Sequence, residues 1–183
     1  NRYNKAVRFV RSALDNNDLG KIRLVSVILR WCRPQAYYDL SPWRGTFSHD
    51  GGVLTNQGIH HIDLLRYLGG EISQVYARMA TLGASIEVED TAIAMVEFSR
   101  GALGSVEVTT AARPDDFEAS ITIVGAKGLA RIGGIAVNEL QIFTPDSSAC
   151  PVNSEEFVGI KGFGAVYGFG HGLMYEDIFR DLE

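Results

Sequence analysis

The alternation of apolar and polar positions predicts helices at both ends of the chain and one near its middle. Apolar residues recur at helical spacing over 1–14, 57–68 and 171–182. The pair Gly69-Gly70 is expected to end the middle helix, because glycine commonly follows a helix C-terminus. No apolar stretch is long enough to span a bilayer, and the start does not resemble a signal peptide. Since the chain lacks an initiator Met and its last helix still runs at the end, we expect it to be an excerpt of a longer protein.

Between these helices the pattern changes to short β-branched and apolar runs that are typical of strands. The predicted strands cover 22–31, 72–82, 90–99, 102–111, 118–124, 128–132 and 137–143. Sequential strands bracketed by helices, without regular strand–helix alternation, predict an α+β fold. We expect an open, mostly antiparallel twisted sheet with helices on one face. Because both faces of 90–99 carry apolar residues, the uncovered face is predicted to meet a second subunit or domain.

Composition agrees with one folded domain over residues 1–183. The chain is 46% hydrophobic and 21% charged, which argues against long disorder or a fibrous repeat. A net charge of −5 without a basic run makes nucleic acid and anionic membranes poor partners, so a small molecule is favoured. The two cysteines, Cys32 and Cys150, are far apart, which favours a reducing, cytoplasmic location over a disulfide framework.

The candidate chemistry lies after a long loop over 32–56 that is rich in aromatic and polar side chains. From Asp50 to Asp63, two carboxylates and two imidazoles accompany the amide of Asn56. On a helix, Asn56 and His60 would project on one side of its start and share one ligand. Histidine titrates near neutrality, so His60 is the candidate acid/base, while His61 points about a hundred degrees away and is expected to be structural.

A structural histidine and a metal site are the alternatives at this position. Asp63 is expected to orient His60 rather than to react. Potential metal ligands are His49, Asp50, His60, His61 and Asp63. Adjacent histidines diverge on a helix and no His-Glu-x-x-His pattern occurs, so no metal is expected.

A glycine-rich stretch precedes the last predicted helix. Residues 162–168 lack the spacing of a nucleotide-binding loop and are interpreted as a flexible loop. His171 follows Gly170 at the predicted helix start, where a glycine turn is able to approach an anionic ligand.

The motif Asp50-Gly51-Gly52-x-Leu54-x-Asn56-x-Gly58-x-His60-x-x-Asp63 resembles the signature of the Gfo/Idh/MocA oxidoreductases. It lies in their C-terminal domain, whose fold is like that of the glyceraldehyde-3-phosphate dehydrogenase C-terminal domain. The segments 1–4, 19–22 and 170–179 also resemble parts of that domain, so the similarity spans nearly the whole chain. The family members are NAD(P)-dependent sugar and polyol dehydrogenases.

Within the family, the segments 37–38, 43–46 and 56–57 look most like the branch that oxidises UDP-N-acetyl-aminosugar uronates at the 3-position. In these relatives a hydride passes to the nicotinamide, a lysine of a Glu-Lys-Pro motif assists, and the histidine aligned with His60 is the acid/base. Neither that lysine motif nor a Gly-x-Gly-x-x-Gly segment after a strand occurs here. The resemblance therefore implies that NAD or NADP is bound mainly by a Rossmann domain outside this chain.

The resemblance also implies roles for individual residues. Expected substrate contacts are Arg2, Tyr38, Trp43, Arg44, Asn56 and His171, and expected supporting residues are Asp50, Gly51, Gly52 and Asp63. Many family members carry Asp at the position of Asn56, whose amide can hydrogen-bond a sugar hydroxyl but cannot act as a base. A homodimer or homotetramer through the open sheet face is expected. An NAD-dependent glycosidase of the same family and a non-catalytic sugar-binding or scaffold protein stay open as alternatives.

Overall fold

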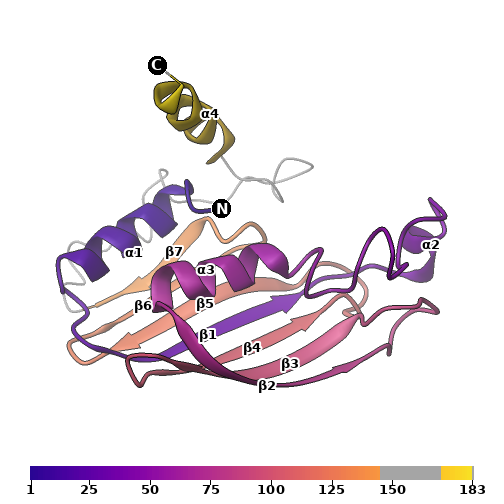
Figure 1. Cartoon of the computed structure of the whole chain (residues 1–183), viewed down its shortest axis with the longest axis horizontal. Coiled ribbons are helices and arrows are strands. Elements are labelled where there is room, and N and C mark those ends of the chain that lie inside the picture. The colour runs from indigo at the N-terminus through magenta and orange to yellow at the C-terminus, as the bar shows by residue number, and fades with distance from the viewer. Residues whose placement is uncertain (145–169, 183) are drawn as a thin grey trace.

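A computed structural model describes residues 1–144 and 170–182 as a seven-stranded sheet with helices on one side (Figure 1). The helices are α1 (Lys5–Asp15), α2 (Gln35–Tyr38), α3 (Ile59–Gly69) and α4 (Gly170–Asp181). The strands are β1 (Ile22–Arg30), β2 (Ile72–Ala80), β3 (Thr91–Phe98), β4 (Leu103–Thr109), β5 (Glu118–Gly125), β6 (Leu129–Gly133) and β7 (Glu139–Phe143). The α+β class and the set of strands predicted from the pattern are confirmed.

The first strand lies in the middle of the sheet. The strand order is β2-β3-β4-β1-β5-β6-β7, so β1 joins two antiparallel meanders. It pairs parallel with β4 and antiparallel with β5, while the remaining neighbours described are antiparallel. The sheet is therefore mixed, with one parallel junction at its centre, as the expectation of a mostly antiparallel sheet allows.

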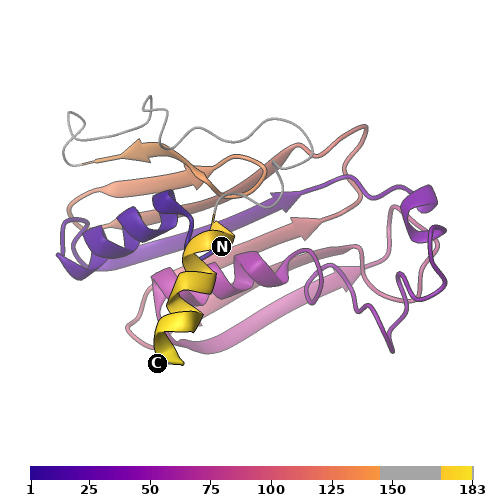
Figure 2. The same ribbon diagram turned by 90° about the horizontal axis from the view of Figure 1, so that it is seen from above.

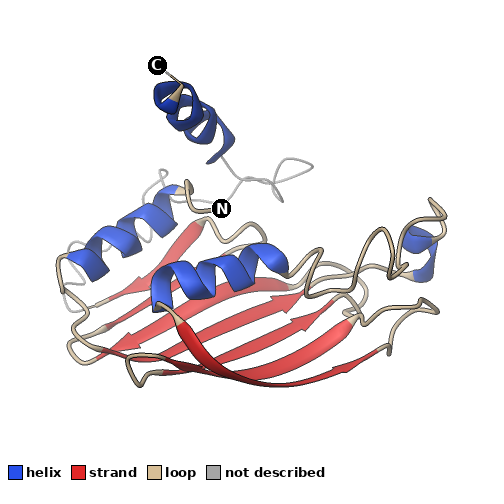
Figure 3. Cartoon of the chain, viewed as in Figure 1, coloured by secondary structure: helices blue, strands red, loops and turns tan. Residues whose placement is uncertain are grey.

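Helices α1 and α3 lie side by side on the same face of the sheet (Figures 2 and 3). Alternate residues of β1, namely Val25, Val27 and Leu29, are fully buried under them. The helices contribute Val7 and Val10 from α1 and Leu64, Leu65 and Leu68 from α3 to the same core. Period-two burial on the strands and helical spacing on the helices thus meet in one apolar layer.

The opposite face, called the open face below, carries no helix among the described elements. Exposed apolar side chains gather on its central and β2-side strands: Leu24, Tyr76, Ile93, Met95 and Leu103. At one end of this face Arg30 forms ion pairs with Glu107 (2.6 Å) and Glu118 (3.2 Å), and Glu118 also pairs with Arg131 (2.6 Å). The open face therefore combines an apolar centre with a ladder of paired charges.

Two helix starts differ from their prediction. Helix α1 begins at Lys5 because residues 1–4 form a turn, in which the amide of Asn4 donates to the carbonyl of Asn1 (2.9 Å). Helix α3 begins at Ile59 rather than at residue 57. The carbonyl of Val53 accepts a hydrogen bond from the Gly58 amide (2.6 Å), so the preceding residues coil as successive turns.

The expectation that Asn56 lies one helical turn before His60 was therefore wrong in detail. Asn56 belongs to the turns that lead into α3. The predicted loop over 32–56 also contains the one-turn helix α2, which the pattern did not predict. Cys150 and the glycine-rich stretch 162–168 lie outside the described residues.

Candidate active site

Asp50 organises the turns before α3. Its carboxylate accepts hydrogen bonds from the Gly45 amide (2.6 Å) and from the side-chain amide nitrogen of Asn56. An ionised carboxylate only accepts, so the NH₂ group of Asn56 must face Asp50. The amide oxygen of Asn56 is then left to accept a hydrogen bond from a ligand.

The two glycines beside Asp50 make this turn sterically feasible. Gly51 adopts φ +73°, in the left-handed region that favours glycine. At Gly52 a Cβ atom would lie only 1.9–2.1 Å from the carboxylate of Glu89. The same carboxylate accepts the Leu54 amide (3.1 Å), and the Glu89 carbonyl accepts that of Val53 (2.9 Å).

Sequence reasoning missed Glu89. It lies in the loop between β2 and β3, more than thirty residues after the turn that it contacts. The one available signal was the adjacent pair Glu89-Asp90 in front of an apolar strand. That signal does not specify a partner.

His60 lies in the first turn of α3 with an exposed side chain. Although the side chain is exposed, protein atoms shield part of the imidazole from water, which lowers its pKa below the usual value, whereas Asp63 acts in the opposite direction. The ring is therefore predominantly neutral at pH 7 and has an unprotonated nitrogen that is able to accept a proton.

Asp63 binds Arg2 one turn after His60. Its carboxylate accepts from Arg2 Nε (2.8 Å) and Nη2 (2.5 Å), and the guanidinium lies 4.7 Å from the centre of the Tyr67 ring. The Asp63 hydrogen bond raises the pKa of Arg2. Arg2 and Asp63 thus form a bidentate pair on the surface of α3 next to the candidate acid/base.

His61 points into the interior. It is 2% exposed, and neither ring nitrogen makes a hydrogen bond of normal geometry among the described residues, although the Gln57 backbone lies close enough to raise its pKa slightly. Its ring lies edge-on to Trp31 with 6.1 Å between ring centres. Burial lowers the pKa of His61 to about 4, with a smaller contribution from His60, so this imidazole stays neutral.

A row of alternating aromatic rings and guanidinium groups follows the loop after β1. In order, its members are Trp31, Arg33, Tyr37, Arg44 and Trp43. Arg44 lies 4.2 Å from the Tyr37 ring centre and 4.8 Å from that of Trp43. Arg33 is neutralised by Asp116 (2.8 Å), whereas Arg44 has no acidic partner in the part of the chain that the structure describes.

The other predicted contact residues are distributed around this row. Tyr38 is 7% exposed, and its hydroxyl shares a hydrogen bond with the Thr110 hydroxyl (3.0 Å); burial raises its pKa. His171 is exposed in the first turn of α4. Helix α4 stands off the helical layer and contacts the N-terminal segment through Tyr3 and Asp177 (Figure 1).

The structure brings the predicted residues together in three groups. Asp50, Gly51, Gly52 and Asn56 share one turn; His60, Asp63 and Arg2 share the start of α3; Tyr38, Trp43 and Arg44 share the aromatic loop. Asp50 connects the first group to the third, since it binds the amide that directly follows Arg44.

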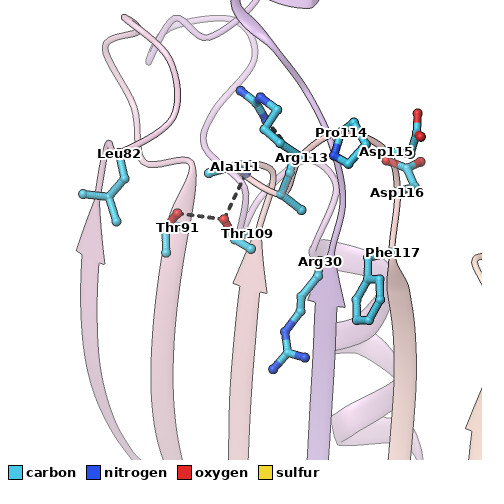
Figure 4. A pocket seen from close by; sticks show the side chains of 11 residues that line it. Arg30, Leu82, Thr91, Thr109, Ala111, Arg113, Pro114, Asp115, Asp116 and Phe117 are labelled. Atoms are coloured by element: carbon cyan, nitrogen blue, oxygen red, sulfur yellow. Dashed lines mark hydrogen bonds between the residues drawn. The ribbon is translucent and has the colours of Figure 1, made fainter.

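Two cavities accompany these elements. One of about 400 Å³ lies beside the aromatic loop and is lined by Tyr38, Arg44, Ser85 and Glu87 among others. A larger one of about 660 Å³ lies at the end of the open face, over Arg30 and the hydroxyl pair of Thr91 and Thr109 (2.8 Å) (Figure 4). Because the sheet separates the larger cavity from α3, only the smaller one belongs to the candidate active site.

The described residues include no cluster of three or more His, Cys, Asp or Glu side chains able to hold a metal ion. Among the helices in the described ranges, none has the length and apolar character needed to cross a membrane.

Comparison with known proteins identifies the family. The model of the GFO/IDH/MocA C-terminal domain matches residues 7–131, which is more than half of the chain. The chain belongs to the GFO/IDH/MocA family. This confirms the resemblance found in the motif around His60.

The solved structures similar to this GFO/IDH/MocA domain include two WlbA dehydrogenases, both in complex with NADH and UDP-GlcNAcA. The Bordetella pertussis protein is 39% identical with a TM-score of 0.87, and the match covers 99% of this chain and 52% of that one. The Chromobacterium violaceum protein is 40% identical with a TM-score of 0.84, covering 99% and 50%. Myo-inositol 2-dehydrogenase of Thermotoga maritima is 26% identical over 79% of this chain and 42% of its own length. This chain therefore spans about half the length of these GFO/IDH/MocA relatives.

Proposed function

We propose that residues 1–183 are the substrate-binding and oligomerisation domain of an NAD(P)-dependent dehydrogenase that oxidises a sugar or nucleotide-sugar hydroxyl. The observation that carries this proposal is the exposed, predominantly neutral imidazole of His60 at the start of α3, in the same motif as Asn56, whose NH₂ group faces Asp50 and leaves its amide oxygen free to accept. Membership of the GFO/IDH/MocA family supports a dehydrogenase, and the WlbA structures support a nucleotide-sugar substrate.

Each residue has a defined task in this proposal. A nicotinamide held by a dinucleotide-binding domain outside the chain supplies the hydride acceptor. The residues described here contain no strand, glycine-rich turn and helix unit that would bind it, so their part is to hold the sugar and move its proton. An unprotonated ring nitrogen of His60 takes the hydroxyl proton, and Asn56 orients the sugar through a second hydroxyl.

The aromatic loop supports an anionic substrate. Arg44 lies against the rings of Tyr37 and Trp43 and lacks an acidic partner among the described residues, so its charge is available for a carboxylate or a diphosphate. Trp43, 42% exposed, offers a face for a sugar or base. Both features fit a UDP-sugar uronate better than a neutral polyol.

The test uses the intact parent protein and follows nicotinamide reduction by absorbance with UDP-aminosugars, their uronates and free polyols. We expect turnover with one sugar class and a loss of at least about a hundredfold in kcat for His60→Ala, because general base catalysis contributes that much. His49→Ala, at another exposed histidine, is the matched control.

Four outcomes would overturn or redirect the proposal. Unchanged kinetics in His60→Ala would exclude it as the base, and unchanged kinetics in Asn56→Ala would remove that residue from the site. Release of a free glycosidic leaving group would identify a glycosidase. Binding of sugar without any reduction of bound cofactor would favour a binding or scaffold protein.

A further inference from the structure

An acidic segment in the loop between β2 and β3 contacts two parts of the candidate active site, namely the aromatic loop and the turn before α3. Glu87 donates its backbone amide to the Gly45 carbonyl (3.1 Å), and its carboxylate accepts the Phe47 amide (3.0 Å). Two residues later, Glu89 binds the amides of Val53 and Leu54. The segment thus contacts the Arg44 side of the loop and the turn before α3 at the same time.

This segment is anchored firmly to the sheet. Asp90 is 1% exposed, and its carboxylate accepts the amides of Leu82 (2.9 Å), Gly83 (2.6 Å) and Ala84 (3.1 Å). Its carbonyl accepts the amide of Thr110, the residue after β4 (2.9 Å). A buried carboxylate with this many donors fixes its loop, because releasing it would leave a buried charge unpaired.

Two hydrogen bonds connect Glu89 to the helix that carries His60. The Glu89 carbonyl holds the amide of Val53, and the carbonyl of Val53 holds the amide of Gly58, the residue that caps α3. The Glu89 carboxylate meanwhile lies directly against Gly52. A shift of Glu89 therefore moves the turn and the first residues of α3 together.

From these contacts we infer that Glu89 is a positioning residue for the Asn56–His60 site. It touches neither of them and acts through the backbone from Gly52 to Gly58. The inference rests on the proposed function for its catalytic consequence, but the mechanical linkage is independent of any reaction.

The kinetic test compares Glu89→Ala and Glu89→Gln in the full-length enzyme with its active sugar. In Glu89→Ala the Leu54 amide loses its acceptor, and kcat should fall by about ten- to a hundredfold with cofactor binding unchanged, since small misplacements of reacting groups have this effect. In Glu89→Gln the side-chain oxygen still accepts, so kcat should return to within about fivefold of wild type. Glu97→Gln removes the same charge from β3, outside the turn, and serves as the control.

A second test does not depend on activity. Hydrogen exchange in the full-length protein should be at least about tenfold faster for the backbone amides of 53–58 in Glu89→Ala, but not in Glu97→Gln. Unchanged exchange in this segment, or wild-type kcat in Glu89→Ala, would overturn the inference. If the wild-type protein oxidises no sugar, the proposed function fails while the exchange result still decides the linkage.

Gly52→Ala tests the same contact with the Glu89 side chain in place, which covers the case in which Glu89→Ala folds poorly, and the double variant completes a cycle. Gly52→Ala places a methyl group on the Glu89 carboxylate and should accelerate exchange over 53–58 by itself. Adding Glu89→Ala removes that clash, so the two substitutions should be less harmful together than the sum of their effects. Additive effects would contradict direct contact between the two residues.

Discussion

Beneath α3, three buried nitrogen atoms make no hydrogen bond of normal geometry among the described residues: both ring nitrogens of His61 and the indole nitrogen of Trp31. Leaving a buried polar atom unpaired costs about 1–3 kcal/mol. His61 nevertheless lies next to His60, where a neutral ring excludes a second positive charge from the neighbourhood of the acid/base. Its protonation state therefore bears on the stability of the fold.

His61 should make the domain sensitive to acid. Its pKa is about 4 in the folded chain and near 6.5 when unfolded, so the unfolded state binds more protons between these values. The His61 contribution to stability is complete above pH 6.5 and is lost as the pH falls from 6.5 towards 4. Urea unfolding should show a loss of roughly 2–3 kcal/mol from this group between pH 7.5 and 4.5.

The contribution of His61 can be separated from that of the carboxylates by substitution. His61→Phe keeps a ring of similar size and should flatten the pH dependence of the unfolding free energy in that window. His49→Phe, at an exposed histidine, should leave it unchanged. Parallel pH profiles for wild type and His61→Phe would show that the buried imidazole is not the titrating group.

At the scale of elements, the close approach of β3, β4 and β1 depends on a strand glycine. A Cβ atom at Gly104 would lie 2.6 Å from Val96 Cγ2, 2.9 Å from Phe98 Cε2 and 3.0 Å from the Val25 carbonyl. The space above Gly104 is therefore filled by atoms of the neighbouring strands, and no room is left for a methyl group.

Gly104→Ala should accordingly destabilise the domain by about 1–3 kcal/mol, which is typical of overpacking. The urea midpoint would fall with an unchanged m-value. Ser105→Ala, on the next residue and the opposite face, should change stability by less than about 0.5 kcal/mol. If the urea midpoint of Gly104→Ala equals that of wild type, the strands are able to move apart and accommodate the methyl group, and the packing argument is wrong.

The elements differ in how far sequence alone predicts them. Strands such as β3 were predictable because buried Ala92, Ala94 and Val96 alternate with exposed residues, a period that reflects local geometry. The start of α3 was not, because it depends on a hydrogen bond to Val53 within a turn that Glu89 holds from a distant loop. The parallel junction between β1 and β4 was also missed, since pairing between distant segments leaves no periodic signal.

In the candidate site, too, local features could be predicted from the sequence and long-range contacts could not. His60, Asn56 and Asp50 were predictable because their types and spacing are local to one motif. Their geometry was not: Asp50 binds the NH₂ group of Asn56 and so orients its amide through a contact that spacing does not encode. Arg2 was predicted as a substrate contact, and the structure adds its pairing with Asp63, sixty-one residues away.

At the scale of the whole molecule, we predict that the open face is the surface for self-association. Apolar side chains such as Ile93 (60% exposed) and Met95 (50%) lie beside charges that already neutralise one another. A second copy of the chain would cover the apolar area and leave the ion pairs of the charge ladder intact. In a monomer, the apolar area stays exposed to solvent.

Ile93→Glu should therefore shift the full-length protein toward a smaller species in light scattering, because a buried, unpaired carboxylate opposes association. Arg100→Glu changes charge in the exposed β3–β4 turn and should leave the mass unaltered. A monomeric wild-type protein at high concentration would contradict this assignment of the open face.

The central place of β1 also has a consequence for synthesis on the ribosome. Leu24 pairs with Leu103 on one side and Val124 on the other, so β1 emerges long before either partner. At ordinary elongation rates, about 5–20 s pass between the synthesis of β1 and that of its partners β4 and β5, and its backbone groups are unpaired in the sheet during that time. Each meander can form early from adjacent segments, but neither can join the other without β1. Until β4 and β5 are synthesised, this apolar strand lacks both of its partners in the sheet.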